Sequence, residues 1–350
     1  MKPELLIFHL NGAVIDVSHS VDTAVRRTVQ SYLAYFLGIS GSGALVSEED
    51  VEWFRVVAGL ENPWELATGM LRYVLSLLPK PLRKGSPPTN PGEAVAVLKK
   101  RRGPVEDLSL ADVREKADFA AAAERIRDAG GGLEGVAEMV GGWEHPLLMA
   151  EGEVQEGNLV RHLFQEIYLG RQTFGRLERM HARFYRGAGM IENERLLLGP
   201  GTLERIRAHY RRRMAAVTEW TREMAQLSMN HLKIGSVFDA LITWEDLVAE
   251  EARLQRLGEE RQLRKPHPFV LLDAAAHLDP NGTRPAVYIG NTPDDMRAAR
   301  AAAETDERPF LAWAILTASS NPQRLKARLE EAGAERIFDQ PSELMDALLA

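Results

Sequence analysis

The sequence predicts an α/β fold, in which a Rossmann-like parallel sheet is interrupted by a large, all-helical cap domain. A single short apolar run stands near the N-terminus, at Glu4–Phe8, and is closed by a turn. No strong strand pattern follows between Ser18 and about Leu198, whereas short apolar strands and helices alternate from Leu198 onward. Repeated strand–helix units predict a parallel sheet that is covered by helices on both faces.

The isolated first strand is most simply placed in the same sheet as the later strands. This placement predicts an α/β core made of residues 1–17 and 198–350, with residues 18–197 inserted as the helical domain. A chain of 350 residues is long enough for two domains. Open parallel sheets bind ligands beyond the carboxyl ends of their strands, so we expect the functional site at that edge.

Apolar residues at helical spacing run through the insertion, starting with Val21, Ala24 and Val25. The predicted helices there begin near Ser18 and continue with Glu49–Gly59, Asn62–Leu78, Leu110–Ala129 and Gly157–Tyr168. Two stretches, Pro79–Gly92 and Gly130–Gly142, are rich in proline or glycine, and we expect surface loops or partly disordered connections there.

The C-terminal part alternates between helices and strands. The predicted strands are Met214–Val217, Val237–Ile242, Ala286–Ile289, Leu311–Leu316 and Ile337–Phe338. The predicted helices are Thr202–Arg212, Thr221–Met229, Phe269–Leu278, Pro293–Ala303 and Pro322–Ala332.

Composition excludes several classes of function. The net charge of -7 gives no reason to expect nucleic acid or an anionic membrane as a partner. The chain has no cysteine, which excludes disulfides, thiolate metal sites and cysteine nucleophiles. No apolar stretch approaches the ~20 residues that span a bilayer, and the N-terminal apolar run is too short for a signal peptide. We therefore expect a cytoplasmic protein.

Four short polar strings lie at the ends of predicted strands or at the start of a predicted helix, and their order along the chain can be compared with known motifs. They are His9-Leu10-Asn11-Gly12, Thr218-Glu219, Arg264-Lys265-Pro266-His267-Pro268 and Gly290-Asn291-Thr292-Pro293-Asp294-Asp295. Their order and spacing resemble the four signature motifs of the haloacid dehalogenase (HAD) superfamily, in the branch with a helical cap after the first motif. The resemblance covers the N-terminal strand and the chain from about Leu198 to its end.

The first motif of that family reads Asp-x-Asp-Gly-Thr-x-x-Asp, and the string here is His9-Leu10-Asn11-Gly12-Ala13-Val14-Ile15-Asp16. The glycine and the last aspartate match, but both catalytic aspartates are replaced. Thr218 matches the second motif, and Lys265-Pro266-His267-Pro268 matches the third. The fourth motif, Gly-Asp-x-x-x-Asp, matches with Asn291 in place of its first aspartate and with Asp295 retained.

The resemblance implies phosphate chemistry that this chain is poorly equipped to perform. The family uses an aspartate nucleophile, an aspartate acid/base and a magnesium ion held by carboxylates. Here the nucleophile position is His9, and the acid/base position is Asn11, which cannot exchange a proton usefully near pH 7. A magnesium-ligand position is Asn291, so we expect the family's magnesium not to bind and no cofactor to be present.

The groups that hold phosphate in the family are retained. The resemblance places Thr218 and Lys265 against the phosphoryl oxygens, and Asp295 beside the lysine or the metal. The expected ligand-binding set is Gly12, Thr218, Lys265, Asn291 and Asp295. The opposite alternative is that Lys265 and Asp295 pair fully while His9 fills the pocket, which would leave no anion site. Asn11 and Asn291 also suit a turn and a helix cap, and His9 could be a core residue.

Two functions are therefore compatible with these residues, and the sequence leaves open whether the chain is an enzyme. The first is a catalytically impaired pseudophosphatase that binds a small phosphorylated or anionic molecule, or a protein partner. The second is an active phosphatase or phosphotransferase that uses His9 as a phosphohistidine nucleophile. Without a strong metal site or a proton donor, charge in the transition state would be poorly compensated, which favours the first.

Overall fold

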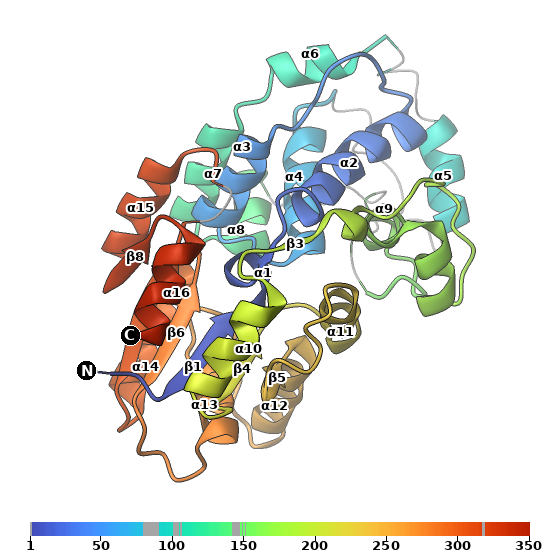
Figure 1. Ribbon diagram of the computed structural model, residues 1–350. Helices are drawn as coiled ribbons and strands as arrows, with labels where there is room; N and C mark the ends of the chain where they lie inside the picture. Colours follow the sequence, from blue (N-terminus) through green and yellow to red (C-terminus); the bar gives the residue numbers. More distant parts are fainter. Residues whose placement is uncertain are drawn as a thin grey trace. The chain divides into compact units, whose positions relative to one another are not determined.

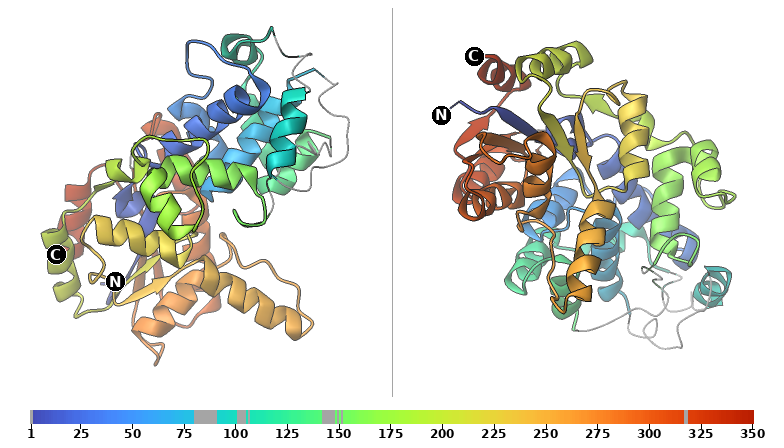
Figure 2. Two further views of the ribbon diagram at one scale, coloured as in Figure 1. Left: turned by 90° about the vertical axis from the view of Figure 1, so that its right-hand side faces the viewer. Right: turned by 90° about the horizontal axis from the view of Figure 1, so that it is seen from below.

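The computed structural model describes residues 2–79, 91–100, 105, 107–141, 148, 150, 152–316 and 319–350. The chain forms two compact units (Figures 1 and 2). One consists of Met1–Val17 with Glu194–Ala350, and the other of Ser18–Asn193. The return to the first unit thus lies between residues 193 and 194, whereas the sequence placed it between residues 197 and 198. Among the described residues, no helix is long and apolar enough to cross a membrane.

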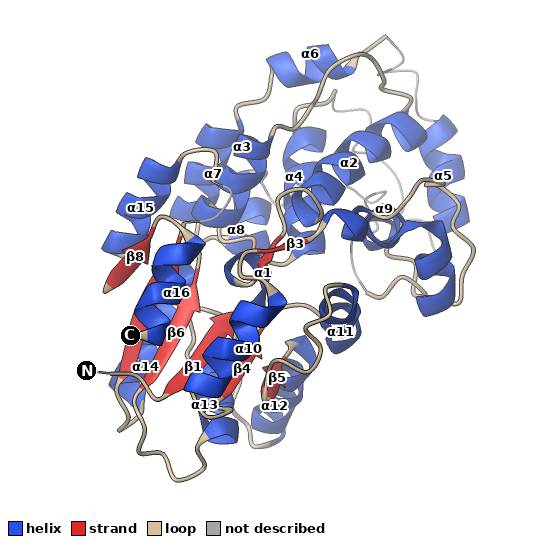
Figure 3. Ribbon diagram, viewed as in Figure 1, coloured by secondary structure: helices blue, strands red, loops and turns tan. Residues whose placement is uncertain are grey.

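A six-stranded, wholly parallel sheet forms the centre of the α/β unit (red in Figure 3). Its order is β5-β4-β1-β6-β7-β8. The strands are β1 (Leu5–His9), β4 (Met214–Val217), β5 (Ala240–Ile242), β6 (Ala286–Gly290), β7 (Phe310–Ile315) and β8 (Arg336–Phe338). The first strand of the chain therefore lies in the middle of the sheet, which confirms the predicted α/β fold.

Strand β1 is buried along its whole length because the sheet is covered on both faces. Leu6 and Phe8 face one side, where they share an apolar cluster with residues of α10 (Pro200–His209), α11 (Arg222–His231) and α16 (Pro341–Leu349). Ile7 points the opposite way and pairs in register with Tyr288 of β6. Full burial of one such side chain stabilises the fold by roughly 1.5–3 kcal/mol.

The other helices of this unit follow the strands. They are α12 (Trp244–Arg256), α13 (Phe269–Leu278), α14 (Pro293–Thr305) and α15 (Pro322–Glu331). Helices α12 and α16 were not predicted from the sequence. A short turn of helix, α1 (Leu10–Ala13), follows β1, and β2 (Ile15–Asp16) then pairs with β3 (Arg195–Leu196) as a two-residue antiparallel ladder.

The second unit is helical. Its elements are α2 (Val21–Tyr32), η1 (Leu33–Leu37), α3 (Glu48–Glu52), η2 (Trp53–Val57), α4 (Pro63–Ser76), α5 (Pro91–Lys100), α6 (Leu110–Glu115), α7 (Phe119–Asp128), α8 (Gly132–Met139), α9 (Leu159–Leu177) and η5 (Met190–Asn193). Asn62 accepts from the backbone N–H groups of Trp64 and Glu65, and Pro63 occupies the first turn, so α4 begins there.

Two of the sequence-based expectations for this unit were wrong. Gly130–Gly142 is not a loop, because it contains α8; Gly131 adopts φ 76°, and Val136 buries its side chain. The predicted helix Leu110–Ala129 is two helices, since the Asp118 side chain accepts from the N–H of Ala121 and starts α7. The predicted loop at Pro79–Gly92 lies largely outside the described residues.

A buried histidine–carboxylate pair lies inside the helical unit. His162 Nε2 is 2.8 Å from Glu166 Oε1, one turn further along α9, and both side chains are almost fully buried. The Glu166 carboxylate also accepts from three successive backbone N–H groups. These belong to Arg183 (2.6 Å), Phe184 (2.7 Å) and Tyr185 (2.8 Å). Burial would raise the pKa of Glu166, but the His162 hydrogen bond and these N–H groups lower it instead.

Candidate active site

His9 is the last residue of β1, where its backbone pairs with Val217 of β4. The chain then turns sharply, and Gly12 takes φ 98°. A Cβ atom at Gly12 would lie 2.3 Å from the Asn291 amide nitrogen, so only glycine fits both the turn and this approach. The ends of β1 and β6 are thereby brought into contact through Gly12 and Asn291.

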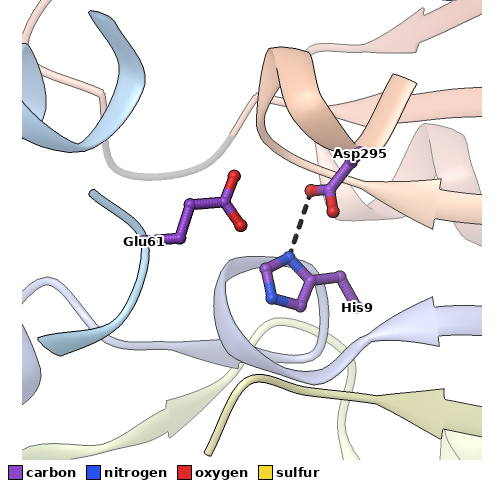
Figure 4. A group of neighbouring side chains, drawn as sticks. All are labelled: His9, Glu61 and Asp295. Atoms are coloured by element: carbon purple, nitrogen blue, oxygen red, sulfur yellow. Dashed lines mark hydrogen bonds and ion pairs between the residues drawn. The ribbon is translucent and has the colours of Figure 1, made fainter. Parts of the chain in front are cut away.

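The Asp295 carboxylate is the centre of the site, and Figure 4 shows its contact with His9. Asp295 lies in the first turn of α14, where Thr292 and Asp295 form a capping box. Oδ1 accepts from Lys265 Nζ and the Tyr288 hydroxyl, both at 2.7 Å. Oδ2 accepts from His9 Nδ1 (3.1 Å) and from the backbone N–H groups of Asn291 (2.9 Å) and Thr292 (3.0 Å). Five donors thus surround one fully buried carboxylate.

Charge keeps this carboxylate ionised. Burial would raise the pKa of Asp295, but the charges of His9 and Lys265 and their hydrogen bonds hold it well below its usual range. An ionised carboxylate can only accept hydrogen bonds, so the proton of the shared bond belongs to His9 Nδ1. The second ring nitrogen of His9, Nε2, lies on the opposite edge of the imidazole.

The ammonium group of Lys265 is paired with two carboxylates. Its side chain is only 4% exposed, and its ammonium contacts Asp295 at 2.7 Å and Glu219 Oε1 at 3.8 Å. The two carboxylates outnumber the one ammonium, so the surroundings of Lys265 offer an incoming anion little net attraction.

The remaining polar groups also bond to one another. The Thr218 hydroxyl donates to Asn11 Oδ1 at 2.5 Å and accepts from the Trp220 N–H at 3.1 Å. Two buried amide atoms, Asn11 Nδ2 and Asn291 Oδ1, have no hydrogen-bond partner among the described residues. Asparagine at these two positions therefore leaves one donor and one acceptor unsatisfied.

A small pocket is bordered by His9, Thr218, Glu219 and Lys265, and residues of α12 and α13 line the rest of it. Its volume is about 10 Å³. Such a volume holds about one water molecule. The enclosed part of this pocket is therefore smaller than a phosphoryl group.

The structure brings the sequence-predicted residues together in three contacts. His9 and Lys265 meet on Asp295, Thr218 meets Asn11, and Gly12 meets Asn291. Two participants were missed: Tyr288 and Glu219. The alternation of side chains along β6 could have indicated Tyr288, because a tyrosine buried in a parallel strand needs a partner for its hydroxyl. Glu219 directly follows Thr218 and carries no motif signal of its own.

The site does not suit the magnesium ion that HAD-type chemistry requires. The retained carboxylate, Asp295, accepts five hydrogen bonds, which exceeds the roughly four lone-pair positions of a carboxylate. The other positions offer His9, whose Nδ1 carries a proton, and Asn291, which is neutral. Magnesium prefers charged oxygen ligands in octahedral geometry, and none of these groups supplies a free one.

Comparisons with known proteins bear on the fold alone. No protein-family model matches the sequence, and no curated protein is detectably similar to it. An X-ray structure from the Northeast Structural Genomics Consortium matches 99% of this chain and 98% of its own, at 15% identity and a TM-score of 0.60. Phosphatase Tt82 from Thermococcus thioreducens matches at 19% identity (93% and 98% of the two chains, TM-score 0.48). A provisionally named haloacid dehalogenase-like hydrolase from Bacteroides fragilis matches at 13% identity (98% and 100%, TM-score 0.45).

The chain has a Rossmann-like α/β fold. Its parallel sheet has β1 at the centre, a helical unit is inserted after that strand, and the four motif strings meet at the carboxyl edge. This is the architecture that the resemblance to the HAD superfamily predicted.

Proposed function

We propose that this chain is a catalytically impaired relative of the HAD phosphatases that binds a ligand and does not turn it over. The observation that carries the proposal is the Asp295 network. In it, Lys265 and His9 neutralise a carboxylate that would otherwise be available to a metal ion. The proposal includes the absence of bound magnesium.

The chemistry of the altered positions supports this. A phosphatase of this class needs a carboxylate nucleophile and a proton donor, and His9 and Asn11 stand in their places. Asn11 is moreover bonded to Thr218, so the hydroxyl expected to hold a phosphoryl oxygen donates elsewhere. Losses within one catalytic unit are not additive, and one of them can already remove most of the rate.

The proposed ligand is a small phosphorylated or otherwise anionic molecule. In the conformation described, the cleft would bind such an anion weakly, because Lys265 and Thr218 are engaged internally. An anion must displace Asp295 from Lys265, or enter through a shift of α12, to gain a direct contact. A protein partner is the other ligand class compatible with a fold that has lost its chemistry.

One observation favours a second candidate, phosphoryl transfer through His9. Asp295 accepts a hydrogen bond from Nδ1 and so orients the ring, which leaves Nε2 to act as the nucleophile. The aspartate of a Ser-His-Asp triad orients its histidine in the same way. Attack of Nε2 on an acyl phosphate would form an N–P bond and break the P–O bond to the carboxylate leaving group. That leaving group departs with the electron pair and needs no proton from Asn11.

Two measurements test the proposal. Hydrolysis of a panel of phosphomonoesters with added magnesium should stay at background in the wild type and be unchanged in His9→Ala. Intact mass after incubation with acetyl phosphate should show no added phosphoryl group. Robust turnover that His9→Ala abolishes would overturn the proposal, and a phosphorylated protein that His9→Ala prevents would establish the second candidate instead.

A further inference from the structure

A second cavity of the α/β unit lies between α11 and the edge strand β5, and we refer to it as the α11–β5 cavity. It shares no lining residue with the small pocket beside Lys265. Its volume is about 380 Å³, whereas that of the small pocket is about 10 Å³. Small-molecule sites measure about 300–1,000 Å³. The α11–β5 cavity therefore has the volume of a small-molecule site.

One wall of the cavity is a polar row on α11. Arg222, Gln226 and Asn230 follow one another at intervals of four residues, which places them on one face of the helix. Gln226 and Asn230 are exposed, and neither side chain has a hydrogen bond with a described residue. Each of their carboxamides offers a donor and an acceptor. The wall can therefore donate to a ligand and accept from it at two successive positions.

The turn after α11 holds the far end of this wall. Lys233 adopts φ 59°, and the Ile234 N–H donates to the Met229 carbonyl at 2.8 Å, which is the pairing of a Schellman motif. The chain then passes close to Asn230, because a Cβ atom at Gly235 would lie 2.6 Å from Asn230 Oδ1. The Asn230 carboxamide is therefore placed against a turn that the backbone itself fixes.

The floor of the cavity is apolar and belongs to the core of the unit. Met229 is buried, and Phe238 and Leu241 are half-buried and pack against the apolar cluster around β1. The Phe238 ring meets Phe8 edge-on, with 6.3 Å between the ring centroids. Because the core already holds these side chains, the floor is formed before a ligand arrives, and it can bury an apolar group.

Strand β5 directs backbone groups toward the same cavity. The Thr218 N–H donates to the Ile242 carbonyl at 3.0 Å, so Ile242 faces β4. The preceding residue, Leu241, therefore directs its C=O and N–H to the open edge of the sheet. Arg222 Nη1 donates to the Leu241 carbonyl at 3.3 Å. The Leu241 N–H lies on the same edge and adds a backbone donor to the side chains of α11.

The one cationic group that lines the cavity is already paired. Arg222 Nη2 lies 2.5 Å from Asp246 Oδ2, and the Arg222 backbone N–H donates to Glu245 at 2.9 Å. Two carboxylates beside one guanidinium give an incoming anion little net attraction. The groups that remain for a ligand, two carboxamides and a backbone N–H, are all uncharged.

We propose that the α11–β5 cavity binds an uncharged small molecule that carries an amide group beside an apolar group. A carboxamide and an amide match one another because each offers one donor and one acceptor, so that two parallel hydrogen bonds can form. The apolar floor takes the rest of the molecule. The proposal goes beyond the function proposed for the site at the carboxyl edge of the sheet, and it holds whether or not that site is active.

N-acetyl-leucinamide is the probe, and NMR titration of the full chain is the measurement. The test variant is Gln226→Ala/Asn230→Ala, which changes two exposed helical residues to a good helix former. The matched control, Gln255→Ala/Gln323→Ala, removes two exposed carboxamides from α12 and α15 of the same unit. We expect saturable binding to the wild type in the low millimolar range, a loss of at least about tenfold in the test variant, and a change within about twofold in the control.

A charged analogue of the probe tests the chemical class of the ligand. N-acetyl-leucine has a carboxylate in place of the terminal amide. It should bind at least about fivefold more weakly than N-acetyl-leucinamide, because Glu245 and Asp246 lie beside Arg222.

Four outcomes would overturn the proposal. The first is no saturable binding to the wild type up to about 20 mM probe. The second is an equal loss in the test and control variants, which would place the probe outside the cavity. The third is binding of N-acetyl-leucine as tight as that of the amide, which would indicate an anion site. The fourth is a blocked hexapeptide that binds at least about tenfold more tightly than the probe, which would assign the open edge of β5 to a peptide partner instead.

Discussion

The two units of this chain each contain a buried carboxylate that accepts from a histidine, and the two sites differ in what surrounds the pair. In the α/β unit, Asp295 accepts from His9, Lys265, Tyr288 and two backbone N–H groups. In the helical unit, Glu166 accepts from His162 and three backbone N–H groups. Asp295 thus joins side chains from β1, β6 and the segment before α13, whereas Glu166 fixes one loop to one helix.

The two pairs also differ in the surroundings of the second ring nitrogen of the histidine. His162 Nδ1 is buried and has no hydrogen-bond partner among the described residues, and its ring stacks on Phe174 at 5.0 Å. His9 instead borders a small pocket at the carboxyl edge of the parallel sheet. One histidine–carboxylate pair is therefore enclosed within the helical unit, whereas the other lies at the carboxyl edge of the parallel sheet.

The largest expected effect is that of Asp295→Ala. It would leave the buried Lys265 with only the more distant Glu219 as a counter-charge and His9 Nδ1 without its acceptor, so we expect the α/β unit to lose about 3–5 kcal/mol of unfolding free energy. Hydrogen exchange of the β1 and β6 amides should report this loss, while the amides of α9 keep their protection. Asp294→Ala is the control, since its partner Arg297 is exposed, and it should cost about 0.5 kcal/mol. Equal losses in the two variants would contradict the central role of Asp295.

Glu166→Gln should have the next largest effect, in the other unit. Its amide NH₂ would face backbone N–H groups that now donate to a carboxylate, which should cost about 2–3 kcal/mol. Protection of the α9 amides should fall, and that of β1 should not. Glu124→Gln, which alters a more exposed pair with Arg127 in the same unit, should be nearly neutral. Loss of protection in β1 would show that the comparison between the two networks is wrong.

Acid should weaken both networks. The pKa values of Asp295 and Glu166 are lowered in the folded chain, so their contribution is complete above the unfolded values of about 4. It is lost as the pH falls below that value, by at most about 1.4 kcal/mol per pH unit for each carboxylate. Urea denaturation from about pH 5 downward should show this slope in the wild type and a shallower slope in Asp295→Asn. An unchanged slope in that variant would rule out Asp295 as a source.

Tyr288→Phe should have the smallest effect. It removes one of five donors to Asp295, so we expect a loss of about 1 kcal/mol. Tyr210→Phe is a suitable control, because the Tyr210 hydroxyl has no hydrogen bond with a described residue, although burial raises its pKa to about 12. That change should cost less than Tyr288→Phe in thermal unfolding. The reverse order would mean that the Tyr288 hydroxyl adds nothing to the network.

Much of the fold could be predicted because buried parallel strands are short apolar runs with polar residues at their ends. The positions of β1, β4 and β6 follow from that pattern. Helix α12 was missed because its exposed face is charged and only Leu247 is fully buried, although the capping box of Thr243 and Asp246 marks its start. Helix α8 was missed because glycines usually indicate a loop.

The sequence predicted which residues lie at the site, but it did not predict the hydrogen bonds between them. The motif order placed His9, Lys265 and Asp295 at one edge of the sheet, but it could not show that the Asp295 carboxylate accepts from both His9 and Lys265. That outcome depends on side-chain reach and on Tyr288, which no motif contains. His162 and Glu166 were missed altogether, although a spacing of four residues in a predicted helix places two side chains on one face.

Titration calorimetry of magnesium into the wild-type chain tests the central claim most directly, because it asks whether Asp295 still has room for a metal ion. The saturated carboxylate, together with His9 and Asn291, predicts no binding at micromolar or low millimolar magnesium. The triple change His9→Asp, Asn11→Asp and Asn291→Asp should restore some affinity, which shows that the method detects the site. Micromolar binding to the wild type that Asp295→Asn abolishes would contradict the account.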